Sequence, residues 1–402
     1  LRIRKIIIGT GKNIVFMKKQ LFSLMIAAGL FSLASCTVED NGSTGVITVP
    51  GIPADTEADP NPTLPDAPNT NVANINYVVE TASNGNKVIR FDLTGIQSPE
   101  NPTEWLRLYG TNTSEQNIWI SIDDLPKGFT IENTIDSEEQ VSAVDLVFLV
   151  DNSGSMGEEA NAVAKEILDW SKMLSKTLDM RFGCVGYDYN GEVNGAINMC
   201  GINEIDAFLN RPGKYGIDRT MGFEGPDKDV LAKEYARYRT GSWTADECGV
   251  SSLRYADDLF NFRKNTNRVY VNFTDEPNYP QGHEPMSTQW VKDPNNWPTT
   301  KGTIHTVYSS TYVNWTERPL WEEYPWNLSA YTGGTEIKTN SSFSGVSLST
   351  LPVTGALQNS YIIKFTNVES LFDGQPHKIK ITILSPNGTV RAEKEYVVTF
   401  KI

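Results

Sequence analysis

The sequence predicts an α/β domain with a doubly wound sheet, set between two stretches of β-sandwich strands. Three observations predict it. An unbroken apolar run follows Asp145 as far as Val150, as in a parallel strand covered on both faces. Strand and helix patterns alternate through residues 142–350, which is typical of a layered α/β fold. Residues 74–141 and 351–402 instead alternate apolar and polar side chains in short runs.

The elements of the central range follow in order from their periodicity. After the first strand, apolar residues recur close to every 3.6 positions, which predicts a helix; they are Ala160, Val163, Ala164, Ile167, Leu174 and Leu178. A second strand is predicted at 181–187 and a further helix at 251–260. Two more strands are expected at 268–274 and 303–308.

The flanking stretches contain only strand patterns. Examples before the α/β range are 88–93 and 118–122, and examples after it are 378–383 and 395–400. The α/β domain could be inserted into one sandwich to which both flanks contribute. Two separate small β-domains fit the sequence equally well.

The first 36 residues have the form of an export signal. A charged start at Met17-Lys18-Lys19 precedes an apolar run, Leu21–Leu33, whose thirteen residues are fewer than the ~20 of a membrane-spanning helix. Residues 1–16 are expected to lie upstream of the true start. The segment that ends at Cys36 resembles the lipobox of bacterial lipoproteins, which implies cleavage before Cys36 and its acylation, for example with palmitate. The alternative is an ordinary export signal with an incidental cysteine.

Residues 37–73 contain six prolines and six acidic residues but no lysine or arginine. Such a segment cannot bury enough apolar surface to fold, so a disordered tether is predicted. Glu39-Asp40 resembles the acidic signal that directs lipoproteins to the cell surface in Bacteroidetes-type bacteria, although linker composition explains it equally well. The expected location is the outer membrane or cell surface of a Gram-negative bacterium, with a lipid anchor in the membrane.

Charge and histidine content exclude several functions. From Cys36 onward, 29 basic residues stand against 49 acidic ones, a net charge of −20. A nucleic-acid partner is therefore not expected, because phosphate binding needs a basic surface. The three histidines leave little material for histidine-based catalysis or a multi-histidine metal site.

One motif carries recognisable chemistry. Asp151, Ser153 and Ser155 stand at alternate positions directly after the first buried strand, on the edge where open α/β sheets bind ligands. Their oxygens suit Mg²⁺, or Mn²⁺ or Ca²⁺, and would hold Zn²⁺ poorly. The alternative is that Asp151 only caps the following helix.

The motif resembles the metal-ion-dependent adhesion site (MIDAS) of the von Willebrand factor type A (VWA) family, with its Rossmann-like sheet. The family also uses an aspartate after a later strand, which matches Asp275 of Thr274-Asp275-Glu276, although the family usually has glycine where Glu276 stands. Its threonine from another loop is best matched by Thr244. Weaker candidates for this threonine are Thr240 and Thr220. The resemblance covers residues 142–350.

The resemblance implies adhesion, in which a partner's acidic side chain completes the shell of the cation. We expect an extracellular protein or glycan as the ligand. Long loops add a predicted aromatic rim, although tryptophans that merely pack together are the alternative; the rim residues are Trp243, Trp290, Trp297 and Trp315. Two other functions stay open: assembly of a surface complex or fimbria, and a metal-dependent hydrolase. No positioned base is evident, so an enzyme is not expected.

Three cysteines follow Cys36, an odd number for an exported chain. The simplest arrangement is one disulfide and one buried thiol. Cys184 stands among apolar residues of a predicted strand and is expected to be the buried thiol. Cys200 and Cys248 would then form the disulfide.

Overall fold

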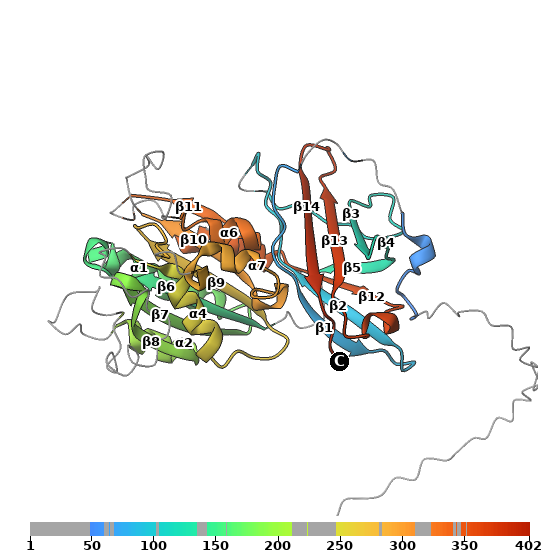
Figure 1. Ribbon diagram of the computed structural model, residues 1–402. Helices are drawn as coiled ribbons and strands as arrows, with labels where there is room; N and C mark the ends of the chain where they lie inside the picture. Colours follow the sequence, from blue (N-terminus) through green and yellow to red (C-terminus); the bar gives the residue numbers. More distant parts are fainter. Residues whose placement is uncertain are drawn as a thin grey trace, which may run out of the picture. The chain divides into compact units, whose positions relative to one another are not determined.

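The computed structural model describes most of the chain after residue 48 (Figure 1). The described residues are 49–59, 64, 68–101, 104–134, 143–157, 159–210, 223, 247–280, 284–309, 323–340, 343, 347–350 and 352–402. The expected export signal, Cys36 and the acidic pair after it lie outside these residues. Within them, no helix is both long and apolar enough to cross a membrane.

The α/β part is built on a six-stranded sheet with the order β11-β10-β9-β6-β7-β8. Neighbouring strands from β11 through β7 run parallel, and β8 is antiparallel to β7. The strands are β6 (Val144–Asp151), β7 (Met180–Asp188), β8 (Glu192–Cys200), β9 (Asn267–Thr274), β10 (Thr303–Tyr308) and β11 (Glu336–Lys338). All eight residues of β6 are buried, which agrees with its unbroken apolar pattern.

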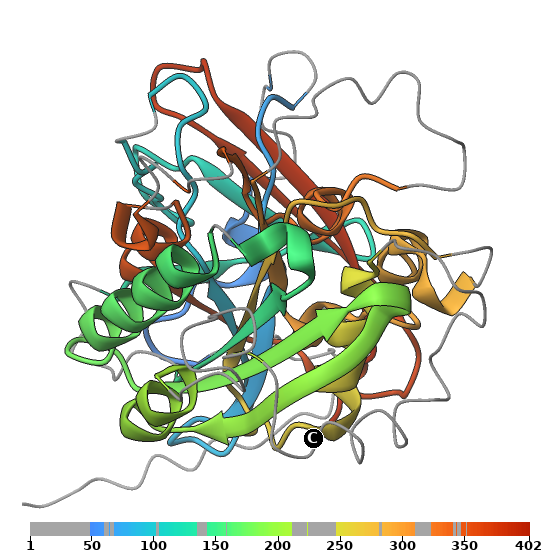
Figure 2. The same cartoon turned by 90° about the vertical axis from the view of Figure 1, so that its left-hand side faces the viewer.

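Helices cover both faces of this sheet. Residues of α1 (Ala160–Leu174), α2 (Ile202–Leu209) and α7 (Pro352–Gln358) share one hydrophobic cluster with Phe148 of β6. Alternate residues of β6 enter a second cluster that contains residues of α4 (Gly249–Leu259), α5 (Thr288–Lys292) and α6 (Asn327–Thr332). The green helix α1 and the yellow-green hairpin of β7 and β8 face the viewer in Figure 2. The predicted α/β class is thus confirmed.

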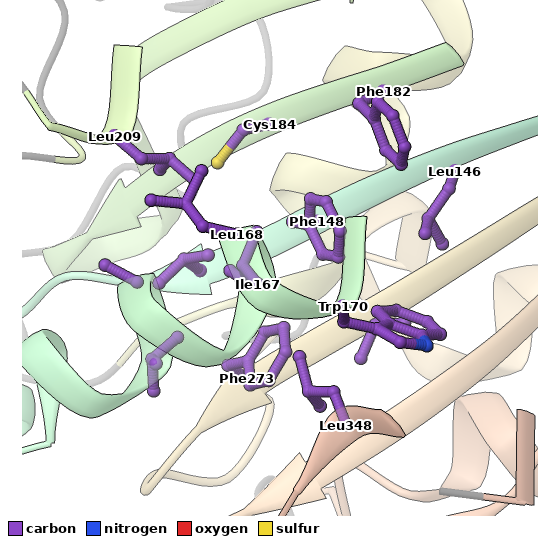
Figure 3. Close-up of a cluster of buried hydrophobic side chains, with 14 of the residues drawn as sticks. Leu146, Phe148, Ile167, Leu168, Trp170, Phe182, Cys184, Leu209, Phe273 and Leu348 are labelled. Carbon is purple, nitrogen blue, oxygen red and sulfur yellow. The ribbon is translucent and has the colours of Figure 1, made fainter. Parts of the chain in front are cut away.

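Aromatic side chains fill the first of these clusters. Phe148, Trp170, Phe182 and Phe273 are fully buried, and Figure 3 shows them gathered between α1 and the sheet. The Trp170 indole also donates a hydrogen bond to Thr354, at 2.6 Å, so α1 is tied to α7 by a polar contact inside the core. This packing joins α1 and α7 to the face of the sheet that carries Phe148.

The flanking strands form two four-stranded antiparallel sheets, ordered β1-β2-β12-β5 and β14-β13-β3-β4. Each sheet combines strands from before and after the α/β part: β12 pairs with β2 and β5, and β13 pairs with β3. The two flanks therefore build one sandwich core rather than two small β-domains. The strands are β1 (Asn76–Thr81), β2 (Lys87–Leu93), β3 (Ile118–Ile122), β4 (Leu125–Pro126), β5 (Phe129–Asn133), β12 (Tyr361–Phe365), β13 (His377–Leu384) and β14 (Arg391–Val398).

Part of the range expected to be a disordered tether is folded. A short 3-10 helix spans Asp55–Glu57, and the Asp55 carboxylate accepts hydrogen bonds from the Gly128 amide, at 3.1 Å, and the Lys127 ammonium, at 2.7 Å. Further on, Val72 is completely buried in the sandwich core. The composition of 37–73 concealed this because polar contacts to distant residues, rather than a run of apolar side chains, hold the segment.

The expected disulfide is wrong, because neither Cys200 nor Cys248 is disulfide-bonded. Cys200 packs against the cluster that contains α1, and its thiol donates to the Phe182 carbonyl at 3.3 Å. Cys248 belongs to the cluster on the opposite face of the sheet. Since the sheet separates the two side chains, no disulfide can join them. The expected burial of Cys184 is confirmed.

Candidate metal centre

The predicted site residues meet at the carboxyl end of the six-stranded sheet. Asp151 is the last residue of β6, and Thr274 is the last residue of the neighbouring parallel strand β9. Asp275 follows Thr274 directly. Because adjacent parallel strands end at the same edge, residues separated by more than a hundred positions become neighbours.

A continuous set of hydrogen bonds links these side chains. The Ser153 amide donates to Asp151 Oδ1 at 3.0 Å, and the hydroxyls of Ser153 and Ser155 are 3.0 Å apart. The Ser155 hydroxyl donates to Asp275 Oδ1, also at 3.0 Å. Four of the five predicted ligands are thus brought together. The fifth, Thr244, lies outside the described residues.

Neighbouring residues fix the orientation of Asp151 and of the turn that follows it. The Thr274 hydroxyl donates to Asp151 Oδ2 at 2.8 Å, so both carboxylate oxygens have partners. Asn152 and Asn194 of β8 exchange two amide hydrogen bonds, at 2.7 and 2.9 Å. Both amides are almost completely buried. These contacts hold the turn rigid, which preorganises its oxygens.

Burial and mutual repulsion disfavour charge on the carboxylates. Asp151 is 1% exposed, and burial together with the nearby Asp275 charge raises its pKa to about 7. Burial also raises the pKa of the half-buried Asp275, although the hydrogen bond from Ser155 opposes this. A cation between the two would favour their charged forms and so oppose both shifts.

One further acidic residue lies at this edge that was not among the site residues predicted from the sequence. Glu247 is 2% exposed, and its Oε2 atom has no hydrogen-bond partner among the residues that the structure describes. Burial, followed by the charges of Asp151, Glu276, Asp275 and Asp188, raises the pKa of Glu247 to about 10. Glu247 lies shortly before α4, the helix that precedes β9. Its position three residues after Thr244, the expected ligand, is the one feature of the sequence that could have indicated it.

The donor set fits a hard divalent cation. It consists of carboxylate and hydroxyl oxygens, which suit Mg²⁺, Mn²⁺ or Ca²⁺. Within the described ranges, the buried Oε2 atom of Glu247 has no hydrogen-bond partner, and a nearby cation would stabilise the charged form of this carboxyl group. Among the described residues, no three His, Cys, Asp or Glu side chains lie close enough to bind a metal by themselves. The hydroxyls of Ser153 and Ser155 are therefore needed as ligands beside the two aspartates.

The predicted aromatic rim is partly wrong. Trp297 is 3% exposed, belongs to a hydrophobic core cluster and donates its indole N–H to the Gly302 carbonyl at 3.0 Å. Trp290 packs edge-on against Trp297 and lies 4.7 Å from the Arg254 guanidinium. Both tryptophans support their loop from inside, because a large ring gains more from burial than from exposure. Trp243 and Trp315 lie outside the described residues.

Tyr189 is an aromatic residue that does face solvent beside the site. It follows β7 and is 46% exposed. A Cβ atom built on Gly154, in the turn between the two serines, would lie 3.9 Å from the Tyr189 hydroxyl. The rim predicted from the sequence consisted of tryptophans alone, and a single tyrosine forms no pattern that would have indicated this position.

Comparison with known proteins gives distant structural likenesses alone. No protein-family model matches the chain, and none of the curated proteins does. The protein BatB from Bacteroides thetaiotaomicron is 10% identical, with a TM-score of 0.31 over 52% of this chain and 97% of its own. An aerotolerance-related membrane protein from Bacteroides fragilis is 11% identical, with a TM-score of 0.27 over 53% of this chain and 98% of its own. The PilB minor pilin from Streptococcus sanguinis is 14% identical, with a TM-score of 0.23 over 50% of this chain and 46% of its own. Likenesses this distant establish neither the family nor the function.

Proposed function

We propose that this protein is a cell-surface lipoprotein that binds an extracellular protein or glycan through a divalent cation at the sheet edge. The observation that carries the proposal is the hydrogen-bonded series Asp151, Ser153, Ser155 and Asp275, which brings two distant loops to one point. The export signal that ends at Cys36 supports anchoring to the outer membrane.

The protein's own residues have separate tasks in this proposal. Asp151 and Asp275 supply negative charge, and the two serine hydroxyls supply neutral oxygens. Thr274 orients Asp151 from the neighbouring strand. The bound cation would supply an electrophilic centre for an oxygen atom of the partner. The exposed ring of Tyr189 offers contact area beside it.

The test is cation-dependent capture of a ligand. The full-length protein, in detergent, is screened against matrix proteins and glycans with Mg²⁺, with Ca²⁺ and with EDTA. We expect binding that EDTA abolishes and that Asp151→Ala and Ser153→Ala both remove. Asp169→Ala is the control, because this exposed residue of α1 pairs with Lys165 at the surface. Capture that persists in EDTA and in Asp151→Ala would contradict the proposal.

A role in assembly is the second candidate, and the sandwich supports it. In the described part of the chain, β1 lies at the end of its sheet and pairs with β2 alone. An edge strand of this kind can accept a strand from a neighbouring subunit. Purification in a stable complex from native membranes, without capture of external ligands, would favour assembly over adhesion.

A further inference from the structure

Glu247 is held at the carboxyl edge of the sheet by its own backbone. The Tyr279 amide donates to the Glu247 carbonyl at 3.0 Å, which ties residue 247 to the loop that follows Asp275. The following residue, Cys248, is the N-cap of α4, and its thiol donates to Asn278 Oδ1 in the same loop at 3.3 Å. Glu247 and Cys248 are thus both tied to residues 278–279, and Glu247 cannot move away from this edge without breaking these contacts.

Gly249, the first residue of α4, brings the backbone close to the strands that carry the site. A Cβ atom on Gly249 would lie 3.0 Å from the Asn272 amide nitrogen of β9 and 3.3 Å from the Tyr187 hydroxyl of β7. Tyr187 is paired with Asp151 across the sheet. A larger residue here would have to displace these side chains, so glycine suits the close approach of the backbone, two residues after Glu247, to β7 and β9.

The surroundings of the Glu247 carboxyl are acidic. The first charges that act on it are those of Asp151, Glu276, Asp275 and Asp188. In the part of the chain that the structure describes, its Oε2 atom has no hydrogen-bond partner, although the residue is 98% buried. A carboxyl group buried among like charges keeps its proton at neutral pH, and it ionises there only when a cation nearby stabilises the carboxylate.

We propose that Glu247 is the third anionic group of the metal centre and makes Ca²⁺ its preferred cation over Mg²⁺. The inference rests on the proposed function, since it requires that a divalent cation binds between Asp151 and Asp275. Glu247 acts from outside the direct ligands, because no three acidic side chains among the described residues form a compact cluster. It is thus a positioning residue, which contributes charge through the intervening oxygens.

Charge count gives the physical reason for the preference. Mg²⁺ is usually held by one or two carboxylates and keeps several of its waters, whereas Ca²⁺ takes more oxygen ligands in a flexible shell. Two aspartates already neutralise a divalent ion, so a third carboxylate leaves the centre with a negative charge. A partner that offers neutral oxygens, such as the hydroxyls of a glycan, is then favoured over one that offers a carboxylate.

The experiment compares the full-length wild type with Glu247→Gln and with Glu276→Gln, a matched change of charge at a half-buried neighbour. Calorimetric titrations with Ca²⁺ and with Mg²⁺ are made on each protein at pH 7. We expect the wild type to bind Ca²⁺ more tightly than Mg²⁺. Glu247→Gln should weaken Ca²⁺ binding about tenfold or more, as is usual for residues behind the ligands. Glu276→Gln should change Ca²⁺ affinity much less, and Glu247→Asp should restore part of it.

Thermal unfolding separates this role from a structural one. In EDTA, Glu247→Gln should unfold at the same temperature as the wild type or above it, because a like charge has been removed. Addition of Ca²⁺ should raise the unfolding temperature of the wild type more than that of the variant. Equal Ca²⁺ affinity in the wild type and Glu247→Gln would overturn the assignment of Glu247. A higher affinity of the wild type for Mg²⁺ than for Ca²⁺ would also overturn it. A wild type that binds neither cation would instead overturn the proposed function itself.

Discussion

A buried histidine makes the α/β part sensitive to acid. His305 lies in β10, 5% exposed, and its Nδ1 atom accepts the Thr335 amide proton at 2.9 Å. Burial lowers the pKa of His305 to about 3. The folded protein therefore keeps a neutral ring, with its proton on Nε2, at every pH where unfolded histidine begins to charge.

The sign and size of the effect follow from proton linkage. The folded pKa is depressed, so this contribution to stability is complete above the unfolded value of about 6.5 and declines as the pH falls below it. Between pH 7 and pH 5 the unfolded state gains most of one proton, while the folded ring gains almost none. The predicted loss is about 2 kcal/mol of unfolding free energy over this interval.

The assay is urea unfolding of the wild type and of His305→Asn at pH 7, 6 and 5, with tryptophan fluorescence as the signal. The asparagine carboxamide oxygen can accept the Thr335 amide proton but does not titrate. All other titrating groups are common to both proteins and cancel in the difference. The stability of the wild type should fall relative to that of the variant by about 2 kcal/mol between pH 7 and 5. Parallel pH profiles would refute the reasoning.

Three further predictions concern the sandwich and the cysteines. Burial lowers the pKa of His377, but its hydrogen bonds to two aspartates outweigh this effect, so the pKa in the folded protein is raised. The protonated ring therefore stabilises the fold fully at a pH below the unfolded value of about 6.5, and this stabilisation is lost as the pH rises through the folded pKa. Wild type should thus lose stability relative to His377→Gln between pH 6 and 8.5 in thermal melts, and an increase would contradict this. Lys127→Met should lower the unfolding free energy in urea by about 2 kcal/mol, since the buried ammonium bonds Asp55 and two backbone carbonyls; an unchanged midpoint would contradict it. Iodoacetamide at pH 8 should alkylate Cys184, Cys200 and Cys248 slowly in the native protein, because burial raises the pKa of Cys200 to about 11 and that of Cys248 to about 12. In urea, all three should be alkylated fully without a reductant. Mass spectra that still show a Cys200–Cys248 crosslink would contradict this last prediction.

The sequence by itself determined the α/β class and most of the candidate site. The buried pattern of β6 and the helical period of α1 are local signals, which depend only on neighbouring residues. Asp151 and Asp275 could be placed at the same edge because both follow parallel strands, and the order of such strands constrains where they end.

Only the tertiary structure decided which distant groups meet. Glu247 lies almost a hundred residues from Asp151, and no local pattern indicates that its carboxyl is buried beside that residue. Trp297 lies in a segment whose aromatic composition is typical of a recognition loop, but its side chain is buried in a core cluster. Cys200 and Cys248 looked like partners until the sheet was seen to separate them. Local periodicity specifies which face of its own element a side chain occupies, whereas burial, charge and pairing across the fold depend on how the elements pack together.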